Sequence, residues 1–101
     1  MLVLATFTKE SSHWSKDPEY NRIFLQAQQN YFNDKLKIKG YIFLNEVFEA
    51  LGMQETKAGH NLGWTKYNGL ISFDIDPTLS GDICLRFNVT GDITNLIWRD
   101  E

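Results

Sequence analysis

The chain has 101 residues, of which 43% are hydrophobic and 14% aromatic, and its formal net charge is −3. This length suits a single domain, and the aromatic content excludes an intrinsically disordered chain. The negative charge argues against general nucleic-acid binding, which needs lysine and arginine side chains to displace counterions.

The first part of the chain predicts a strand followed by a helix. Residues Met1–Thr8 alternate weakly between apolar and polar and favour a strand, with a helical start as the alternative. Asp17 and Pro18 are typical of a helix start, as N-cap and first helical residue. We expect this helix to end near Asn33–Asp34. Helical spacing predicts a buried face formed by Tyr20, Ile23, Phe24, Ala27 and Tyr31.

A short strand or extended link and a second helix are predicted next. The strict alternation of Lys35–Lys39 indicates a strand, and its lysines are typical of an edge strand protected against aggregation. Lysines close to tyrosines also occur in sites for single-stranded nucleic acid, but we favour the edge strand. Tyr41–Leu44 is expected to be a buried connection. Asn45 is the predicted N-cap of the second helix, and Gly52 is its predicted end.

The second part of the chain is predicted to form strands. After a polar loop at Gln54–Leu62, Asn68-Gly69 predicts a type I′ turn. This turn would join Trp64–Tyr67 and Leu70–Ile75 as a hairpin.

The last third of the chain predicts a half-buried strand and a short final one. The apolar–polar alternation of residues 83–89 predicts buried side chains at Ile83, Leu85, Phe87 and Val89. Ile93–Trp98 is expected to be the final strand. The fold class is therefore α+β, a single domain over residues 1–101, with an antiparallel sheet of three or four strands and two helices packed on one face.

Tests for a metal site fail on spacing. Asp74 and Asp76 have the spacing of the first two ligands of a calcium loop. The positions that should supply a third ligand, a glycine and a closing glutamate hold Thr78, Leu79 and Leu85. We expect no metal and no cofactor.

Candidates for catalysis are equally weak. Cys84, the only cysteine, would need a histidine base, and both His13 and His60 lie in predicted loops. We expect Cys84 on the outer face of its strand. Glu46 and Glu49 could form an acid–base pair, but Glu46 is better explained by the positive end of the second helix. We predict no catalytic residue.

One segment suggests a binding surface. Trp64 stands where a loop enters the predicted hairpin, and tryptophan is enriched at binding hot spots. We predict a protein-binding surface formed by Gly59, His60, Gly63 and Trp64. The alternative is that Trp64 is a partly buried core residue.

Several short motifs together resemble a known family. They are Phe43–Val47, Leu51-Gly52, Thr56–Gly59, Gly63-Trp64, Ile71–Asp74 and Arg86–Ile93. Over Gly40–Ile93 the chain resembles a domain-of-unknown-function family found in phages and prophages of Gram-positive bacteria. Thr90 departs from the expected pattern, which has aspartate there. The resemblance implies an origin in a mobile element and supplies no catalytic residue.

These observations favour a non-enzymatic protein-interaction or structural module of a phage or prophage. The alternative is a small phage-type inhibitor that binds a host protein, and a hydrolytic enzyme ranks last. The lone cysteine favours a reducing compartment, so we expect the host cytoplasm or a virion. We expect a protein partner, no nucleic acid and no membrane, because the apolar run at Met1–Ala5 is too short to span a bilayer. An open edge at Lys35–Lys39 or Leu2–Phe7 could also pair with a second chain to give a homodimer.

Overall fold

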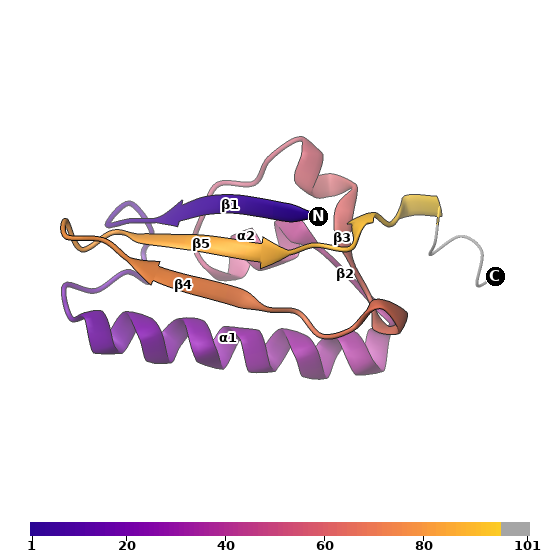
Figure 1. The fold of residues 1–101 in the computed structure, drawn as a ribbon, viewed down its shortest axis with the longest axis horizontal. Coiled ribbons are helices and arrows are strands. Elements are labelled where there is room, and N and C mark those ends of the chain that lie inside the picture. Colours follow the sequence, from indigo (N-terminus) through magenta and orange to yellow (C-terminus); the bar gives the residue numbers. More distant parts are fainter. Residues whose placement is uncertain (96–101) are drawn as a thin grey trace.

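The computed structural model describes residues 1–95, which form two three-stranded antiparallel sheets and two α-helices (Figure 1). The strand orders are β1-β5-β4 and β2-β3-β6. The elements in chain order are β1 (Leu2–Phe7), α1 (Pro18–Lys39), β2 (Tyr41–Phe43), α2 (Leu44–Ala50), the 3-10 turn η1 (Ala58–His60), β3 (Leu62–Thr65), the 3-10 turn η2 (Lys66–Asn68), β4 (Phe73–Pro77), β5 (Ile83–Asn88) and β6 (Gly91–Asp92). The predicted α+β class is confirmed, although the sequence did not indicate a second sheet.

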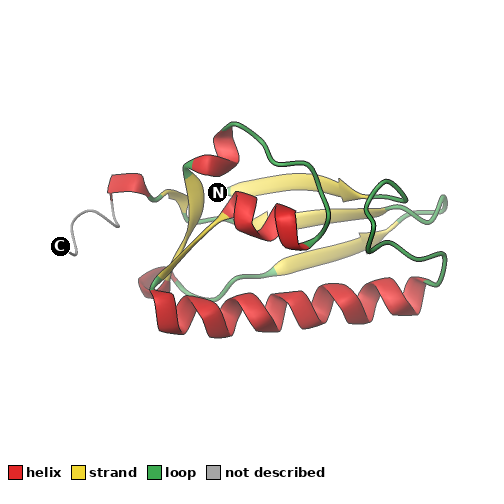
Figure 2. Cartoon of the chain, turned by 180° about the vertical axis from the view of Figure 1, so that it is seen from behind, coloured by secondary structure: helices red, strands yellow, loops and turns green. Residues whose placement is uncertain are grey.

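The larger sheet, β1-β5-β4, has one buried face and one open face. Its inward side chains include Phe7, Phe73, Ile83, Leu85 and Phe87, all at most 5% exposed. The predicted alternation of β5 is thereby confirmed. Seen from behind, α2 crosses the inner face of the sheet and α1 lies alongside β4 (Figure 2). Among the described residues, no helix covers the opposite face, which is turned toward the viewer in Figure 1.

Helix α1 begins where the sequence predicts and ends later. The Asp17 carboxylate accepts a hydrogen bond from the backbone N–H of Glu19 at 3.0 Å, as an N-cap should. The helix ends only at Lys39, and its C-cap is Gly40, whose φ is 95° and whose N–H donates to the Leu36 carbonyl. The predicted strand at Lys35–Lys39 and the helix end at Asn33–Asp34 are therefore wrong. Only Leu36 of the segment Lys35–Lys39 is buried, and a helix can bury this one side chain as well as a strand can.

The predicted buried face of α1 is wrong except for Phe24, which is half-buried and packs against the core. Tyr20, Ile23 and Tyr31 are 50%, 56% and 54% exposed. The residues of α1 that are buried are Asn21, Leu25, Phe32 and Leu36. The helix thus carries two apolar faces, and the one with more tyrosine and isoleucine points to solvent.

The predicted hairpin at Asn68-Gly69 does not form. A type I′ turn needs positive φ at both central residues, and among residues 1–95 only glycines have positive φ. Residues Lys66–Asn68 instead form η2, and β3 and β4 belong to different sheets.

The smaller sheet also differs from the expectation. The expected connection at Tyr41–Leu44 contains β2, which pairs with β3. The expected final strand at Ile93–Trp98 is not seen in the described part, where Thr94 and Asn95 are helical, and residues 96–98 lie outside the described residues.

Helix α2 starts two residues earlier than expected and ends as expected. Its N-cap is Phe43, whose backbone N–H donates to the Glu46 carboxylate at 2.8 Å. Asn45 lies within the helix, and its side chain bonds both backbone groups of Thr56. Gly52, with φ of 71°, follows the C-cap as predicted.

Candidate interaction surfaces

Trp64 is a core residue and not part of a surface. Its side chain is 1% exposed, and its indole N–H donates to the Asn88 backbone carbonyl at 2.9 Å and to the Asn88 side-chain oxygen at 3.0 Å. The expectation that Trp64 lies on the surface is therefore wrong. Trp64 is also buried more deeply than the alternative predicted, which was a partly buried core residue.

The two glycines of the predicted site are explained by close packing. A Cβ atom on Gly63 would lie 2.1 Å from the Ile42 carbonyl oxygen, and one on Gly59 would lie 2.0 Å from the Asn45 side-chain oxygen. Both glycines are buried, and only His60 is exposed. These residues do not form a continuous surface, so a binding role for this segment now rests on His60 alone and stays a prediction.

Among the candidates for catalysis, Cys84 lies apart from both histidines, whereas His13, Glu46 and Glu49 line one pocket. Cys84 is exposed on the outer face of β5, as predicted, opposite Thr6 and Asp76. His13 stacks on the Phe24 ring at 4.9 Å, and His60 is in η1. Within residues 1–95, no three His, Cys, Asp or Glu side chains are grouped so that they could hold a metal ion. No helix in the same range is both long and apolar enough to cross a membrane.

Glu46 is the centre of a charged cluster that the sequence did not indicate. Its carboxylate lies 3.2 Å from the Lys35 ammonium and 3.4 Å from that of Lys39. Burial acts to raise the pKa of Glu46, but the hydrogen bond from the Phe43 N–H and the two lysines outweigh it and hold the pKa below its usual value. This cluster joins α1 to α2, and each of its three charged groups is already paired within it.

The free edge of β1 is the first candidate surface, because backbone hydrogen-bonding groups along it are left unpaired by the sheet. Strand β1 is an edge of its sheet, and in the described chain no strand pairs with its outer side. The Met1 amino group donates to the Val89 carbonyl, which therefore faces β1. Because antiparallel ladders alternate, the backbone groups of Leu2, Leu4 and Thr6 point away from β5 and remain unpaired by the sheet.

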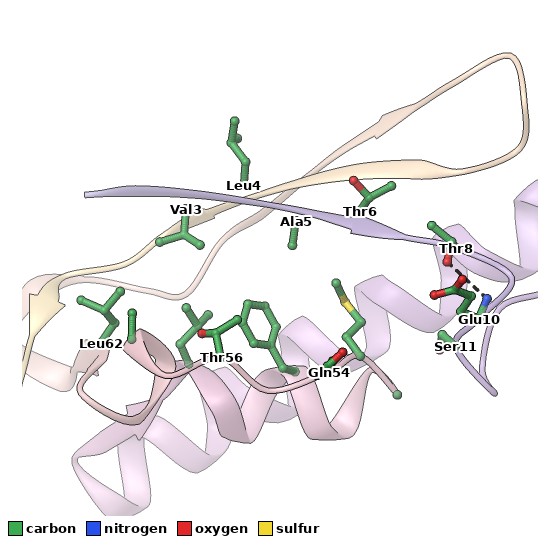
Figure 3. A pocket seen from close by; sticks show the side chains of 15 residues that line it. Val3, Leu4, Ala5, Thr6, Thr8, Glu10, Ser11, Gln54, Thr56 and Leu62 are labelled. Atoms are coloured by element: carbon green, nitrogen blue, oxygen red, sulfur yellow. Dashed lines mark hydrogen bonds between the residues drawn. The ribbon is translucent and has the colours of Figure 1, made fainter.

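A groove of about 540 Å³ runs along this edge, between β1 and the segment that joins α2 to β3 (Figure 3). The side chains of Val3 and Ala5 point toward it, whereas Leu4 projects to the opposite side. Its apolar lining comes from Val3, Ala5, Leu44, Phe48, Met53, Ala58 and Leu62. The groove therefore offers an apolar floor beside unpaired backbone donors and acceptors.

The second surface is the exposed apolar face of α1, which we call the α1 stripe. It consists of Tyr20, Ile23, Ala27, Tyr31 and Ile38. Ile38 is 88% exposed, the highest value among the large side chains of this face. Helical spacing did identify most of this face in the sequence but assigned it to the core.

Comparison with known proteins places the chain in a family without assigning a role. Neither a curated protein nor a solved structure was found to match it. A family model matches residues 2–97, nearly the whole chain. The chain therefore belongs to DUF6353, a family of unknown function.

Proposed function

We propose that this chain is a non-enzymatic protein-binding module whose β1 edge receives an extended segment of a partner protein. The observation that carries the proposal is the unpaired edge of β1 lying directly beside an apolar groove. Strand addition at a free sheet edge is a common mode of peptide recognition, in which main-chain hydrogen bonds supply affinity and pockets for alternate side chains supply specificity.

The geometry of the edge and groove supports a specific proposal for the chemistry of the partner segment. An added strand would exchange hydrogen bonds with Leu2, Leu4 and Thr6 and place every second side chain in the groove. Phe48 and Met53 on the groove floor favour apolar side chains at these positions. The intervening side chains of the partner would lie beside Leu2 and Leu4, which are 63% and 70% exposed.

The edge itself carries no charge, which also bears on the kind of partner. The sequence of β1 is Leu-Val-Leu-Ala-Thr-Phe, without the lysine or proline that commonly protects an edge strand. Nucleic-acid backbones bind through lysine and arginine, so this edge suits a polypeptide. We expect binding that changes little with salt concentration.

The resemblance to phage and prophage domains supports a further part of the proposal, an origin in a mobile element. In that case the module acts in the host cytoplasm or in a virion. Genes for phage structural or accessory proteins beside this one would support the origin, and a conserved neighbourhood of cellular housekeeping genes would contradict it.

The binding proposal is tested with peptides selected from a random library for binding to the immobilised chain. The decisive variant is Leu4→Pro, because the Leu4 N–H points outward and its loss spares the ladder to β5. The proline ring also blocks a neighbouring strand, so we expect at least about tenfold weaker peptide binding, equivalent to about 1.4 kcal/mol.

Leu4→Ala is the matched control, since it removes the same exposed side chain but keeps the N–H. It should retain most of the binding. Amide hydrogen exchange at Leu4 and Thr6 should slow when the peptide binds. Selected peptides that bind Leu4→Pro as tightly as the natural chain, or that protect amides elsewhere, would refute the proposal.

A further inference from the structure

The pair Asn68-Gly69 is a sequence motif that has no part in the proposed function. Of the asparagine residues in the chain, only Asn68 is followed by glycine. Asn68 is the last residue of η2 and Gly69 is its C-cap, and both residues are exposed. This turn lies at the end of α1, where the Lys66 N–H donates to the Gly40 carbonyl at 3.0 Å, and apart from the edge of β1 (Figure 1).

An asparagine that precedes a glycine can react with the main chain. The Gly69 nitrogen would attack the Asn68 Cγ and close a five-membered succinimide ring. The Cγ–Nδ2 bond breaks, and ammonia leaves with the proton that the Gly69 nitrogen loses. Water then opens the ring at either of its two carbonyl carbons, which gives aspartate or isoaspartate. Glycine favours the first step because it has no Cβ atom to block the approach.

The surroundings of Gly69 leave its nitrogen accessible. In the described chain the Gly69 N–H donates no well-formed hydrogen bond, whereas the C-cap residues of α1, α2 and η1 all donate theirs. A Cβ atom placed on Gly69 would meet no atom within 4 Å outside its chain neighbours. The turn can therefore bring the Gly69 nitrogen toward the Asn68 side chain without displacing other residues.

The hydroxyl of Thr65 activates the carbon that is attacked. Its oxygen donates to the Asn68 Oδ1 at 2.8 Å, and Thr65 is 6% exposed, so the fold fixes the donor. A donor on this oxygen draws electrons from Cγ and stabilises the negative charge that develops during the attack. No hydrogen bond from the Asn68 Nδ2 is seen within residues 1–95, which leaves this nitrogen unhindered as the leaving group.

We propose that Asn68 is a site of spontaneous deamidation, in which Gly69 supplies the attacking nitrogen and Thr65 polarises the side-chain carbonyl. Each conversion adds one negative charge to a chain whose net charge is −3. Isoaspartate also adds a methylene group to the main chain between β3 and β4, and the open space around Gly69 accommodates it. The modified chain should therefore stay folded and separate from the unmodified chain on an anion exchanger. The proposal does not depend on strand addition at β1.

Incubation of the full chain at mildly alkaline pH in water labelled with heavy oxygen tests the site, because water oxygen enters each residue that deamidates. Peptide mapping by mass spectrometry should find labelled aspartate and isoaspartate at position 68. Asn30 and Asn61 are internal controls, since both are exposed and precede residues with a Cβ atom. We expect Asn68 to react at least about tenfold faster than either, equivalent to a barrier lower by about 1.4 kcal/mol. Equal rates at the three positions, or no label at position 68, would overturn the proposal.

Two substitutions test the role of Thr65. Thr65→Val keeps the shape of the side chain but removes the hydroxyl, and should slow the reaction of Asn68 by about two- to tenfold. Thr65→Ser keeps the hydroxyl and should react at nearly the natural rate. The rate at Asn68 is divided by the rate at Asn61 in each variant, so that a general loosening of the fold cancels. A ratio for Thr65→Val equal to that for Thr65→Ser would overturn the role of the hydroxyl.

Discussion

Hydrogen bonds between Asn88 and Trp64 join the two sheets. The Asn88 side-chain oxygen accepts from the Trp64 indole N–H and, at 2.7 Å, from the Ser72 backbone N–H. Its amide group donates to the Leu70 carbonyl at 2.9 Å. One side chain at the end of β5 therefore fixes the path of the chain between η2 and β4 and closes the core over Trp64.

We predict that substitutions of Trp64 act on stability. Trp64→Phe removes the N–H donor but keeps most of the volume, and should lower the free energy of unfolding by about 1 to 2 kcal/mol. Trp64→Ala leaves a cavity at a position 1% exposed and should cost about 3 to 5 kcal/mol. Urea denaturation followed by circular dichroism measures both.

Tyr67→Ala, at a 73% exposed position, is the control and should change stability by less than about 0.5 kcal/mol. An unfolding midpoint of Trp64→Ala equal to that of the natural chain would contradict the buried position. A loss of partner binding in Trp64→Ala would report loss of fold and not a contact.

At the scale of elements, Glu46 links the start of α2 to the last turns of α1. Its carboxylate accepts from the Phe43 N–H, which the helix leaves without an intrahelical partner, and lies beside Lys35 and Lys39. Because the folded pKa is below the ordinary value of 4.5, the charged carboxylate stabilises the folded state. This contribution is complete above about pH 4.5 and is lost as the pH falls through the lower folded pKa.

We predict a graded effect of two substitutions at Glu46. Glu46→Gln keeps an acceptor for the Phe43 N–H but loses the charge. Glu46→Ala loses both and should lower the free energy of unfolding by about 1 kcal/mol at pH 7. The deficit of Glu46→Gln should disappear at low pH, where the natural side chain is protonated. Denaturation at a series of pH values measures this. A deficit of Glu46→Gln that is the same at pH 3 and pH 7 would show that the charge contributes nothing.

Sequence patterns that depend only on neighbouring residues predicted their elements correctly. The cap at Asp17-Pro18 and the alternation of β5 depend on local geometry, and both are confirmed. The segment Lys35–Lys39 fits a strand and a helix equally in its local pattern, which does not contain the contact of Lys35 with Glu46, eleven residues later. The turn at Asn68-Gly69 fails because Phe73 pairs with Phe87 in the other sheet.

The assignment of the α1 faces failed for a different reason. The inner side of α1 carries polar residues whose side chains bind backbone groups. Gln29 accepts from the Phe73 N–H at 2.8 Å, and Asn33 bonds both backbone groups of Ile71. Hydrophobic periodicity counts such residues as polar and so points to the outer stripe. The free edge of β1 was foreseen among the open edges, but its groove requires residues from distant segments.

At the scale of the whole molecule, β1 completes a sheet made mostly from the other end of the sequence. Leu2 lies opposite Asn88 and Phe7 opposite Ile83, and the Phe7 side chain is fully buried. Without β1 the core would lose this ring, and both edges of the remaining pair of strands would be exposed. Two-stranded sheets are marginal on their own.

We therefore predict that a chain lacking residues 1–8 does not fold cooperatively. Near-ultraviolet circular dichroism and thermal unfolding should show no native transition. Adding a synthetic peptide of residues 1–8 in excess should restore the transition, because binding to the folded form shifts the equilibrium by mass action. The same peptide with Phe7→Ala should restore less, since the fully buried ring supplies much of the apolar contact. A truncated chain that unfolds at the same temperature as the intact one would show that β1 adds nothing to the core, and its edge would then be a poor anchor for any partner strand.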